Sequence, residues 1–290
     1  MMCIFGCPKP FVGHIGVIQR NAIGSWSRLT PRCQIVLLGG EQGTDRVAEE
    51  FGAAHIPCVG KNASGTPTIG SLFAEAQSVS KFPWMCYCNC DIILLNDLLQ
   101  ALQKVWTVMT STMVVGRRWD LDVREAIPTC PGWDRNLRER VWRHGSRHAH
   151  TGIDFMVFPR GSLGELPAMT VGRGGWDNWM LHHAKSVGLT LVDVSEVVLA
   201  VHQNHDYSHH PGGRRGVSDG AEAQTNVKMA GGTTRLLTLL DADLVLTPAG
   251  RMETRRSAYA IYRALVNSSE SNWCARVLLG AIRGVRRLRR

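Results

Sequence analysis

The residues best suited to chemistry are Asn89-Cys90-Asp91, which lie inside residues 84–95, the strongest strand candidate of the chain. On a strand, side chains two residues apart project from the same face. In open α/β sheets, ligands bind beyond the carboxyl ends of the strands. A hard cation takes carboxylate oxygens as ligands and can stabilise the charge on a departing diphosphate. The motif therefore predicts a Mn²⁺ or Mg²⁺ site formed by Asp91 and Asn89.

Three cysteines, Cys86, Cys88 and Cys90, alternate through the same segment. Their spacing puts them together on the other face of the strand. Three thiols can bind a soft metal, and the alternative is a row of small buried residues on the packed side. The chain has nine cysteines, an odd number, and no CxxC pair, so we expect no disulfide framework.

The elements that must position these residues follow from the alternation of apolar and amphipathic segments. The expected strands are residues 2–5, 34–38, 54–59, 84–95, 113–116, 152–159 and 189–202, and the expected helices are residues 17–26, 44–51, 66–78, 97–108 and 177–185. Strands that alternate with helices in the first half predict βαβ units and a mainly parallel sheet. The polar, Gly-rich residues 211–232 predict a loop, and residues 236–246 predict one further ordered element.

The motif and the order of these features resemble the GT-A-fold nucleotide-diphospho-sugar glycosyltransferases of the family 2 type. Asn89-Cys90-Asp91 looks like their DxD motif with Asn in place of the first Asp, and the resemblance covers residues 2–210. It implies an α/β fold of GT-A type, with a mixed, mainly parallel sheet flanked by helices. It also implies sugar transfer from a nucleotide-diphosphate donor to a hydroxyl acceptor, with a divalent metal.

The resemblance divides the chain into a catalytic domain, residues 1–235, and a C-terminal extension, residues 236–290. Within the domain we expect a nucleotide-binding half (residues 1–116), an acceptor-binding half (residues 117–210) and a loop (residues 211–235).

In members of this family, a His or Asp that lies far along the chain from the DxD motif often binds the metal as well. His202 and His205 are candidates for this role. His202 ends the apolar residues 197–201, which favours it over His205. The alternative for a histidine at a strand end is a structural role.

Asp177 is the candidate general base, because inverting members of the family carry an acidic residue at this position in the order of their sequence features. It lies among glycines and between Trp176 and Trp179, whose rings suit stacking with a sugar acceptor. A positioned carboxylate can remove the proton of an acceptor hydroxyl. The alternative is that Asp177 caps the helix that follows it.

Asp154 is a carboxylate within an apolar segment, an arrangement that is unfavourable without a partner. Binding of the acceptor or of the donor sugar is one interpretation, and a salt bridge with Arg117 or Arg118 is the other. Arg117 is also a candidate ligand of the diphosphate, because the guanidinium fork binds phosphate in a bidentate manner, and surface ion pairing is the alternative.

The nucleotide is expected to contact the loop after the first strand, at Pro8 and Lys9, and the end of the second strand, at Glu41. We expect a UDP-sugar as the donor and a glycan or a lipid-linked molecule as the acceptor. The alternative for Glu41 is an exposed loop residue.

The net charge of +9 is concentrated in the tail, where residues 251–290 hold ten Arg and two Glu. The rest of the chain carries about +1, which argues against a nucleic-acid partner.

Residues 273–290 form a basic amphipathic pattern that predicts either contact with an anionic membrane surface or a helix packed on the domain. We find no apolar run of about 18 residues and no signal peptide, so we expect a cytoplasmic protein, peripheral on the inner membrane face if the tail binds lipid.

Two other functions fit parts of the sequence. One is a sugar-nucleotide nucleotidyltransferase, although Gly6-Cys7-Pro8-Lys9-Pro10 is short and Pro-rich for its signature loop. The other is a non-catalytic, membrane-associated binding protein with a degenerate GT-A domain. The chain contains no GxxxxGK[ST] and no GxGxxG after its first strand, which argues against a P-loop or a dinucleotide-binding domain.

Overall fold

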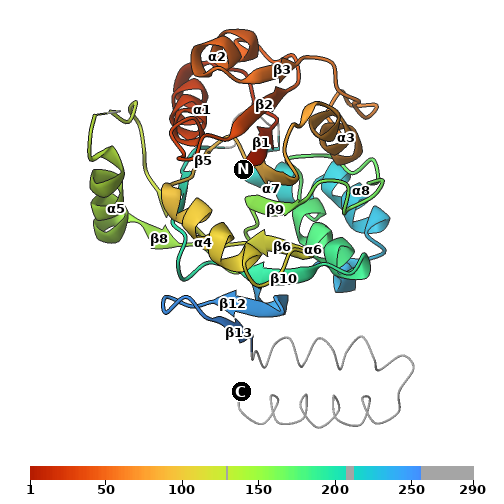
Figure 1. Cartoon of the computed structure of the whole chain (residues 1–290). Coiled ribbons are helices and arrows are strands. Elements are labelled where there is room, and N and C mark those ends of the chain that lie inside the picture. The colour runs from red at the N-terminus through yellow and green to blue at the C-terminus, as the bar shows by residue number, and fades with distance from the viewer. Residues whose placement is uncertain (129, 207–211, 256–290) are drawn as a thin grey trace, which may run out of the picture.

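The computed structural model describes residues 1–128, 130–206 and 212–255, and Figure 1 shows two sheets with helices packed around them. The larger sheet has nine strands. In spatial order they are β13 (Met252–Thr254), β12 (Leu244–Leu246), β10 (Thr190–Asp193), β6 (Thr112–Val115), β9 (Phe155–Pro159), β4 (Trp84–Cys88), β1 (Met2–Gly6), β2 (Gln34–Leu38) and β3 (Ala54–Ile56). Strand β9 runs antiparallel to β4 and β6, β13 runs antiparallel to β12, and the other pairs are parallel.

The smaller sheet has four strands, in the order β5 (Ile92–Ile93), β11 (Ala200–Gln203), β7 (Arg118–Leu121) and β8 (Ser146–Arg147). Strand β11 is parallel to β7 and antiparallel to β5. Strand β5 follows β4 after three residues, so the chain passes from the large sheet to the small one at the predicted motif.

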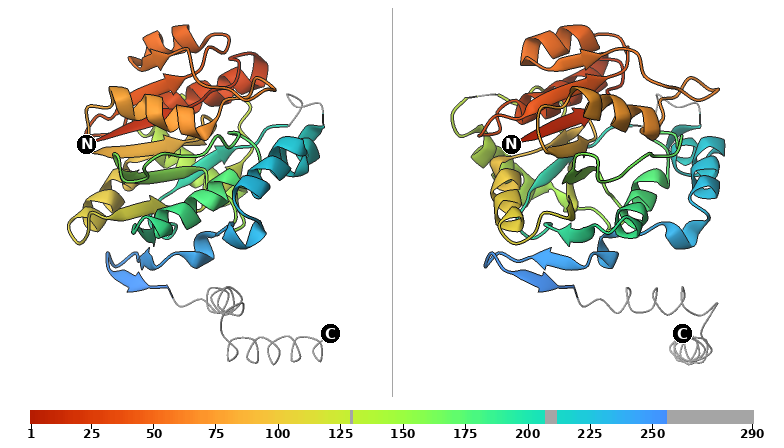
Figure 2. Two further views of the ribbon diagram at one scale, coloured as in Figure 1. Left: turned by 90° about the vertical axis from the view of Figure 1, so that its right-hand side faces the viewer. Right: turned by 45° about the vertical axis from the view of Figure 1, so that its right-hand side comes forward.

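Helices cover both faces of the large sheet and one side of the small sheet. They are α1 (Gly13–Trp26), α2 (Thr44–Phe51), α3 (Ile69–Val79), α4 (Asn96–Trp106), α5 (Trp133–His144), α6 (Trp176–Ser186), α7 (Gly213–Asp219) and α8 (Ala221–Met229), with short 3₁₀ helices η1 (Thr233–Arg235) and η2 (Leu239–Asp241). In the right-hand view of Figure 2, α4 and α6 lie on opposite sides of the strands. This arrangement confirms the expected α/β fold, with a mixed, mainly parallel sheet flanked by helices.

The strands of the large sheet are apolar on both faces. In β1, Cys3 and Phe5 join the core cluster that contains α3 and α6, whereas Met2 and Ile4 join the cluster that contains α1 and α4. Alternate residues therefore serve two separate cores, which explains why these strands are continuous apolar runs in the sequence. A third cluster lies between α5 and the small sheet.

The predicted strand at residues 84–95 is wrong in its extent. Strand β4 ends at Cys88, and Asn89, Cys90 and Asp91 form a turn in which the Ile92 N–H donates to the Asn89 carbonyl (3.1 Å). The rule that alternate residues share a face therefore does not extend to Asn89 and Asp91, because it holds only within a strand. Residues 189–202 likewise contain two strands, β10 and β11, which belong to different sheets.

The three cysteines are the buried small residues of one interpretation above. Cys86, Cys88 and Cys90 all lie in the core cluster on the α1 side of the sheet. Burial raises the pKa of all three thiols well above the ordinary value, so they stay protonated.

The predicted loop at residues 211–232 is also wrong, because residues 213–219 and 221–229 form α7 and α8. Of the glycines that suggested a loop, Gly212 and Gly220 lie before the helices and between them, whereas Gly213 and Gly216 lie inside α7. Ala223 and Asn226 of α8 are buried against the domain. Helix α5 was not predicted either, because Leu137 and Val141 are its only buried residues.

No helix in the described part of the chain is long and apolar enough to cross a membrane. The basic pattern at residues 273–290 lies outside the described residues, and its contact with a membrane stays a prediction.

Candidate functional site

A pocket of about 570 Å³ opens where β1 and β4 of the large sheet end and the small sheet begins. This volume is within the range of ligand sites in enzymes. Ten of the predicted residues line the pocket: Pro8, Lys9, Glu41, Asn89, Asp91, Asp154, Trp176, Asp177, His202 and His205. Arg117 and Trp179 are not among the residues that line it.

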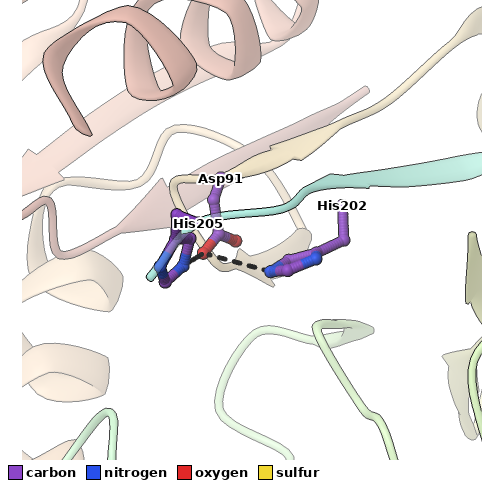
Figure 3. Close-up of side chains that lie close together, drawn as sticks. All are labelled: Asp91, His202 and His205. Atoms are coloured by element: carbon purple, nitrogen blue, oxygen red, sulfur yellow. Dashed lines mark hydrogen bonds and ion pairs between the residues drawn. The ribbon is translucent and has the colours of Figure 1, made fainter. Parts of the chain in front are cut away.

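Asp91, His202 and His205 come together in this pocket, with one ligand atom from each lying within 4.8 Å of the others. Asp91 Oδ2 is 3.2 Å from His205 Nε2 and 3.8 Å from His202 Nε2. Figure 3 shows both imidazole rings directed at the Asp91 carboxylate. The other oxygen, Asp91 Oδ1, is buried and has no hydrogen-bond partner among the described residues.

The electrostatics of this group favour an ionised Asp91. Burial raises the pKa of Asp91, but the hydrogen bond from His205 and the charges of His202 and Lys9 outweigh it and hold the pKa well below its usual range. Burial lowers the pKa of His202, but the contact with Asp120 and the charge of Asp91 raise it overall. The group therefore keeps a carboxylate beside two imidazoles, a donor set suited to a divalent cation.

Asn89 stands apart from this group. Its Nδ2 donates to Asp154 Oδ1 (3.0 Å), and its Oδ1 accepts from the Tyr87 hydroxyl (2.8 Å). The amide thus holds Asp154, and binding of the metal by Asn89 beside Asp91 stays a prediction.

Asp154 forms the salt bridge that was one of its two interpretations, and its partner is Arg118. Arg118 Nη1 lies 2.7 Å from Asp154 Oδ1. The other carboxylate oxygen, Asp154 Oδ2, is buried without a partner among the described residues, although Asp154 lines the pocket. One acceptor of this carboxylate is therefore not satisfied by the described residues.

Arg117 points away from the pocket, which corrects its expected role in binding the donor or the acceptor. Its Nε donates to the His148 carbonyl, and its backbone N–H donates to Ser195 Oγ (2.7 Å). Arg117 precedes β7, and Arg118, the first residue of that strand, is the arginine of the two that lines the pocket.

Asp177 is the second residue of α6, after the N-cap Gly175, and its Oδ1 accepts from the Asn178 N–H (2.9 Å). Burial and the nearby charge of Asp154 raise the pKa of Asp177 to about 7, against the lowering effect of that hydrogen bond. A carboxylate whose pKa is close to neutral is suited to general-base catalysis.

The two tryptophans beside Asp177 have different surroundings. Trp176 lines the pocket and packs edge-on against Tyr87, with ring centroids 5.0 Å apart. Trp179 is buried and stacks on His183, with centroids 4.8 Å apart. Trp179 is therefore a core residue, which corrects its expected role as a wall for the acceptor.

Hydrogen bonds with Gln19 of α1 hold the loop after β1 in place. The Lys9 N–H donates to Gln19 Oε1 (2.7 Å), and Gln19 Nε2 donates to the Lys9 carbonyl (2.8 Å). Burial lowers the pKa of Lys9, whereas the charge of Asp91 acts to raise it. Pro8, Lys9 and Glu41 all line the pocket, so the predicted nucleotide contacts lie together with the metal candidates.

Sequence reasoning missed Arg173, which also lines the pocket. Its Nε donates to Glu222 Oε2 of α8 (2.7 Å), and Glu222 Oε1 accepts from Asn62 Nδ2 (2.6 Å). Three segments distant in sequence thus meet at Glu222. Because α8 was predicted as a loop, no pattern in the sequence pointed to this contact.

The turn that carries Asp91 requires Gly6 at the end of β1. A Cβ added at Gly6 would lie 2.6 Å from the Cys88 carbonyl oxygen and 2.7 Å from Cys90 Sγ. We expect Gly6→Ala to lower the free energy of unfolding by about 1–3 kcal/mol, as overpacking does. Urea denaturation measures this change. In the control Gly40→Ala the nearest atom is 3.4 Å away, and an equal loss there would contradict the explanation.

No family model and no curated protein matches the sequence. S. aureus TarS 1-349 in complex with UDP-GlcNAc is 9% identical at a TM-score of 0.49, covering 72% of this chain and 60% of that one. Glucosyl-3-phosphoglycerate synthase from Mycobacterium tuberculosis, in complex with Mn²⁺, UDP and glucosyl-3-phosphoglycerate, is 14% identical at a TM-score of 0.48, covering 81% and 80%. The chain spans about 60% of TarS 1-349 and 36% of the longer TarS chain.

Proposed function

We propose that the protein is a metal-dependent glycosyltransferase that moves a sugar from a nucleotide-diphosphate donor to a hydroxyl acceptor. One observation carries the proposal: a single pocket contains both the Asp91, His202 and His205 group and the half-buried Asp177. A site for a cation and a carboxylate with a pKa near neutral are the two components that such a transfer needs.

The residues fit a divalent cation. Asp91 presents a buried Oδ1 that no described residue satisfies, and His202 and His205 supply imidazole nitrogens beside it. A cation held by these three residues would neutralise charge on the donor diphosphate. The two nitrogen donors favour Mn²⁺ over Mg²⁺, which prefers oxygen ligands.

The remaining lining residues suit the other parts of the donor. Lys9 and Arg173 bring positive charge to the pocket, which favours binding of a diphosphate. Pro8 and Glu41 lie on the side where the nucleoside is expected. Asp154 Oδ2, buried and unsatisfied among the described residues, suits a sugar hydroxyl as the donor of a hydrogen bond.

Asp177 is the proposed general base. Its carboxylate would accept the proton of the acceptor hydroxyl as the oxygen attacks the anomeric carbon and the nucleoside diphosphate leaves. A base that activates the acceptor directly corresponds to a single displacement, which inverts the configuration of the sugar. We therefore propose an inverting transferase.

A thermal-shift panel of UDP, GDP, dTDP and CDP, each with and without Mn²⁺, tests the proposal. We expect one nucleotide, UDP first, to raise the unfolding temperature in the presence of Mn²⁺ and to have little effect without it. If none of the four shifts the transition with Mn²⁺, the assignment as a nucleotide-sugar enzyme fails.

Turnover separates this proposal from the two alternatives. Slow, metal-dependent hydrolysis of a nucleotide sugar without an acceptor would contradict a non-catalytic binding protein. Release of pyrophosphate from a nucleoside triphosphate and a sugar phosphate would instead identify a nucleotidyltransferase.

A further inference from the structure

His202 and Asp120 are neighbours by strand register. Strand β11 pairs with β7 in parallel, and His202 is the direct partner of Asp120. Side chains of directly paired residues lie on the same face of a sheet. The small sheet therefore places a carboxylate beside one of the proposed metal ligands, at a position that the function proposed above has not used.

The contact between them is on the side of the imidazole away from Asp91. His202 Nδ1 lies 3.1 Å from Asp120 Oδ1, within ion-pair distance but without the geometry of a hydrogen bond, whereas His202 Nε2 faces Asp91 Oδ2 at 3.8 Å. The two ring nitrogens thus face two different carboxylates. A neutral imidazole carries one N–H, so the nitrogen that faces Asp120 as a donor leaves the other as a free lone pair.

Asp120 is itself held firmly. Its Oδ1 accepts from Arg118 Nε (2.9 Å), and its Oδ2 lies 2.6 Å from His148 Nδ1. Arg118 in turn bonds Asp154 across the pocket. The carboxylate therefore has contacts on both oxygens that fix its orientation, and it can fix the ring of His202.

We propose that Asp120 is a positioning residue that holds His202 with Nδ1 protonated and Nε2 directed at the metal. The inference rests on the proposed metal site, although it does not depend on sugar transfer. Carboxylates that bond the second nitrogen of a ligating histidine typically contribute 10–100-fold to metal affinity.

The experiment measures Mn²⁺ binding to the full chain without nucleotide, by the electron paramagnetic resonance signal of free Mn²⁺. We expect Asp120→Ala to weaken Mn²⁺ binding by about 10–100-fold. Asp120→Asn should have a smaller effect, because its amide oxygen can still accept from His202 Nδ1 while the negative charge is lost. Glu196→Ala is the control: it removes a carboxylate that pairs with Arg147 of the same small sheet (3.0 Å), and Mn²⁺ binding should be unchanged.

The unfolding temperature without metal distinguishes positioning from general support of the fold. A structural role alone would lower this temperature in Asp120→Ala while leaving the affinity of the folded protein for Mn²⁺ intact. Unaltered Mn²⁺ affinity in Asp120→Ala, or in Asp120→Asn if the alanine variant does not fold, overturns the proposal. So does a wild-type protein that binds no Mn²⁺. Failure of sugar transfer with normal Mn²⁺ binding would count against the proposed function and leave the role of Asp120 standing.

Discussion

Asp177→Asn is expected to reduce sugar transfer by about 10²–10⁴-fold, the usual contribution of a general base. Asparagine keeps the shape of the side chain and an oxygen to accept from the Asn178 N–H, so α6 should begin as before. The amide cannot accept a proton from the acceptor hydroxyl. Transfer is measured by nucleotide release, and binding of UDP with Mn²⁺ by thermal shift should stay near the wild-type value.

The chain supplies a closely matched control in α5. Asp134 is the second residue of that helix, as Asp177 is of α6, and each follows a tryptophan and a left-handed glycine N-cap. Asp134 is exposed and lies outside the pocket of the proposed site. Asp134→Asn should therefore leave transfer unchanged. Equal rates in Asp177→Asn and Asp134→Asn would remove Asp177 from the mechanism.

The same residue sets an expected pH dependence. The pKa of Asp177 is raised to about 7 by burial and by the charge of Asp154, so the carboxyl group is increasingly protonated below that pH. Only the ionised form accepts a proton. We therefore expect kcat/KM to fall by up to tenfold per pH unit below about pH 7, and this acid limb to be absent from the residual rate of Asp177→Asn.

Asp91→Ala is expected to abolish the metal-dependent binding of nucleotide. Asp91 is the one carboxylate in its group with His202 and His205, and it contacts both rings. A ligand at 100 times its dissociation constant stabilises the folded state by about 2.7 kcal/mol. For a chain of this size that corresponds to a rise in the unfolding temperature of about 5–10 °C, which the variant should lose.

The Glu196→Ala protein also serves as the control for Asp91→Ala, because its carboxylate pairs with Arg147 outside the pocket. Metal-dependent binding should survive in it. If Asp91→Ala retains the full Mn²⁺-dependent shift, the metal site is wrongly assigned, even if the protein proves to be a transferase.

The fold class was predictable because its signal is local. Helix α2 matches the predicted residues 44–51, with Gly52 in the left-handed conformation that ends a helix, and β2 matches residues 34–38. Such signals depend on residues within a few positions of one another. The division of residues 84–95 between two sheets depends on pairing with β11, more than 100 residues away, and no local pattern encodes it.

The residues of the site were likewise predictable only where the signal is local. Asp91, His202 and Asp177 were identifiable because each is a polar residue at the end of an apolar or glycine-rich segment. The choice between Arg117 and Arg118 depended on the exact start of β7, and a shift of one residue reverses which side chain faces the pocket. Trp179 was misassigned because an aromatic residue on a helix next to a site has the same sequence pattern whether it faces the ligand or the core.

The passage of the chain from β4 to β5 has a topological consequence for the proposed metal. Asp91 and His205 are 114 residues apart along the chain, yet they meet because β5 and β11 are adjacent strands. In an unfolded chain, bringing such distant ligands to one cation would carry a large entropic cost of loop closure. Pairing of β5 with β11 closes this loop, so a cation bound by Asp91 and His205 would act as a reversible cross-link between the two halves of the chain.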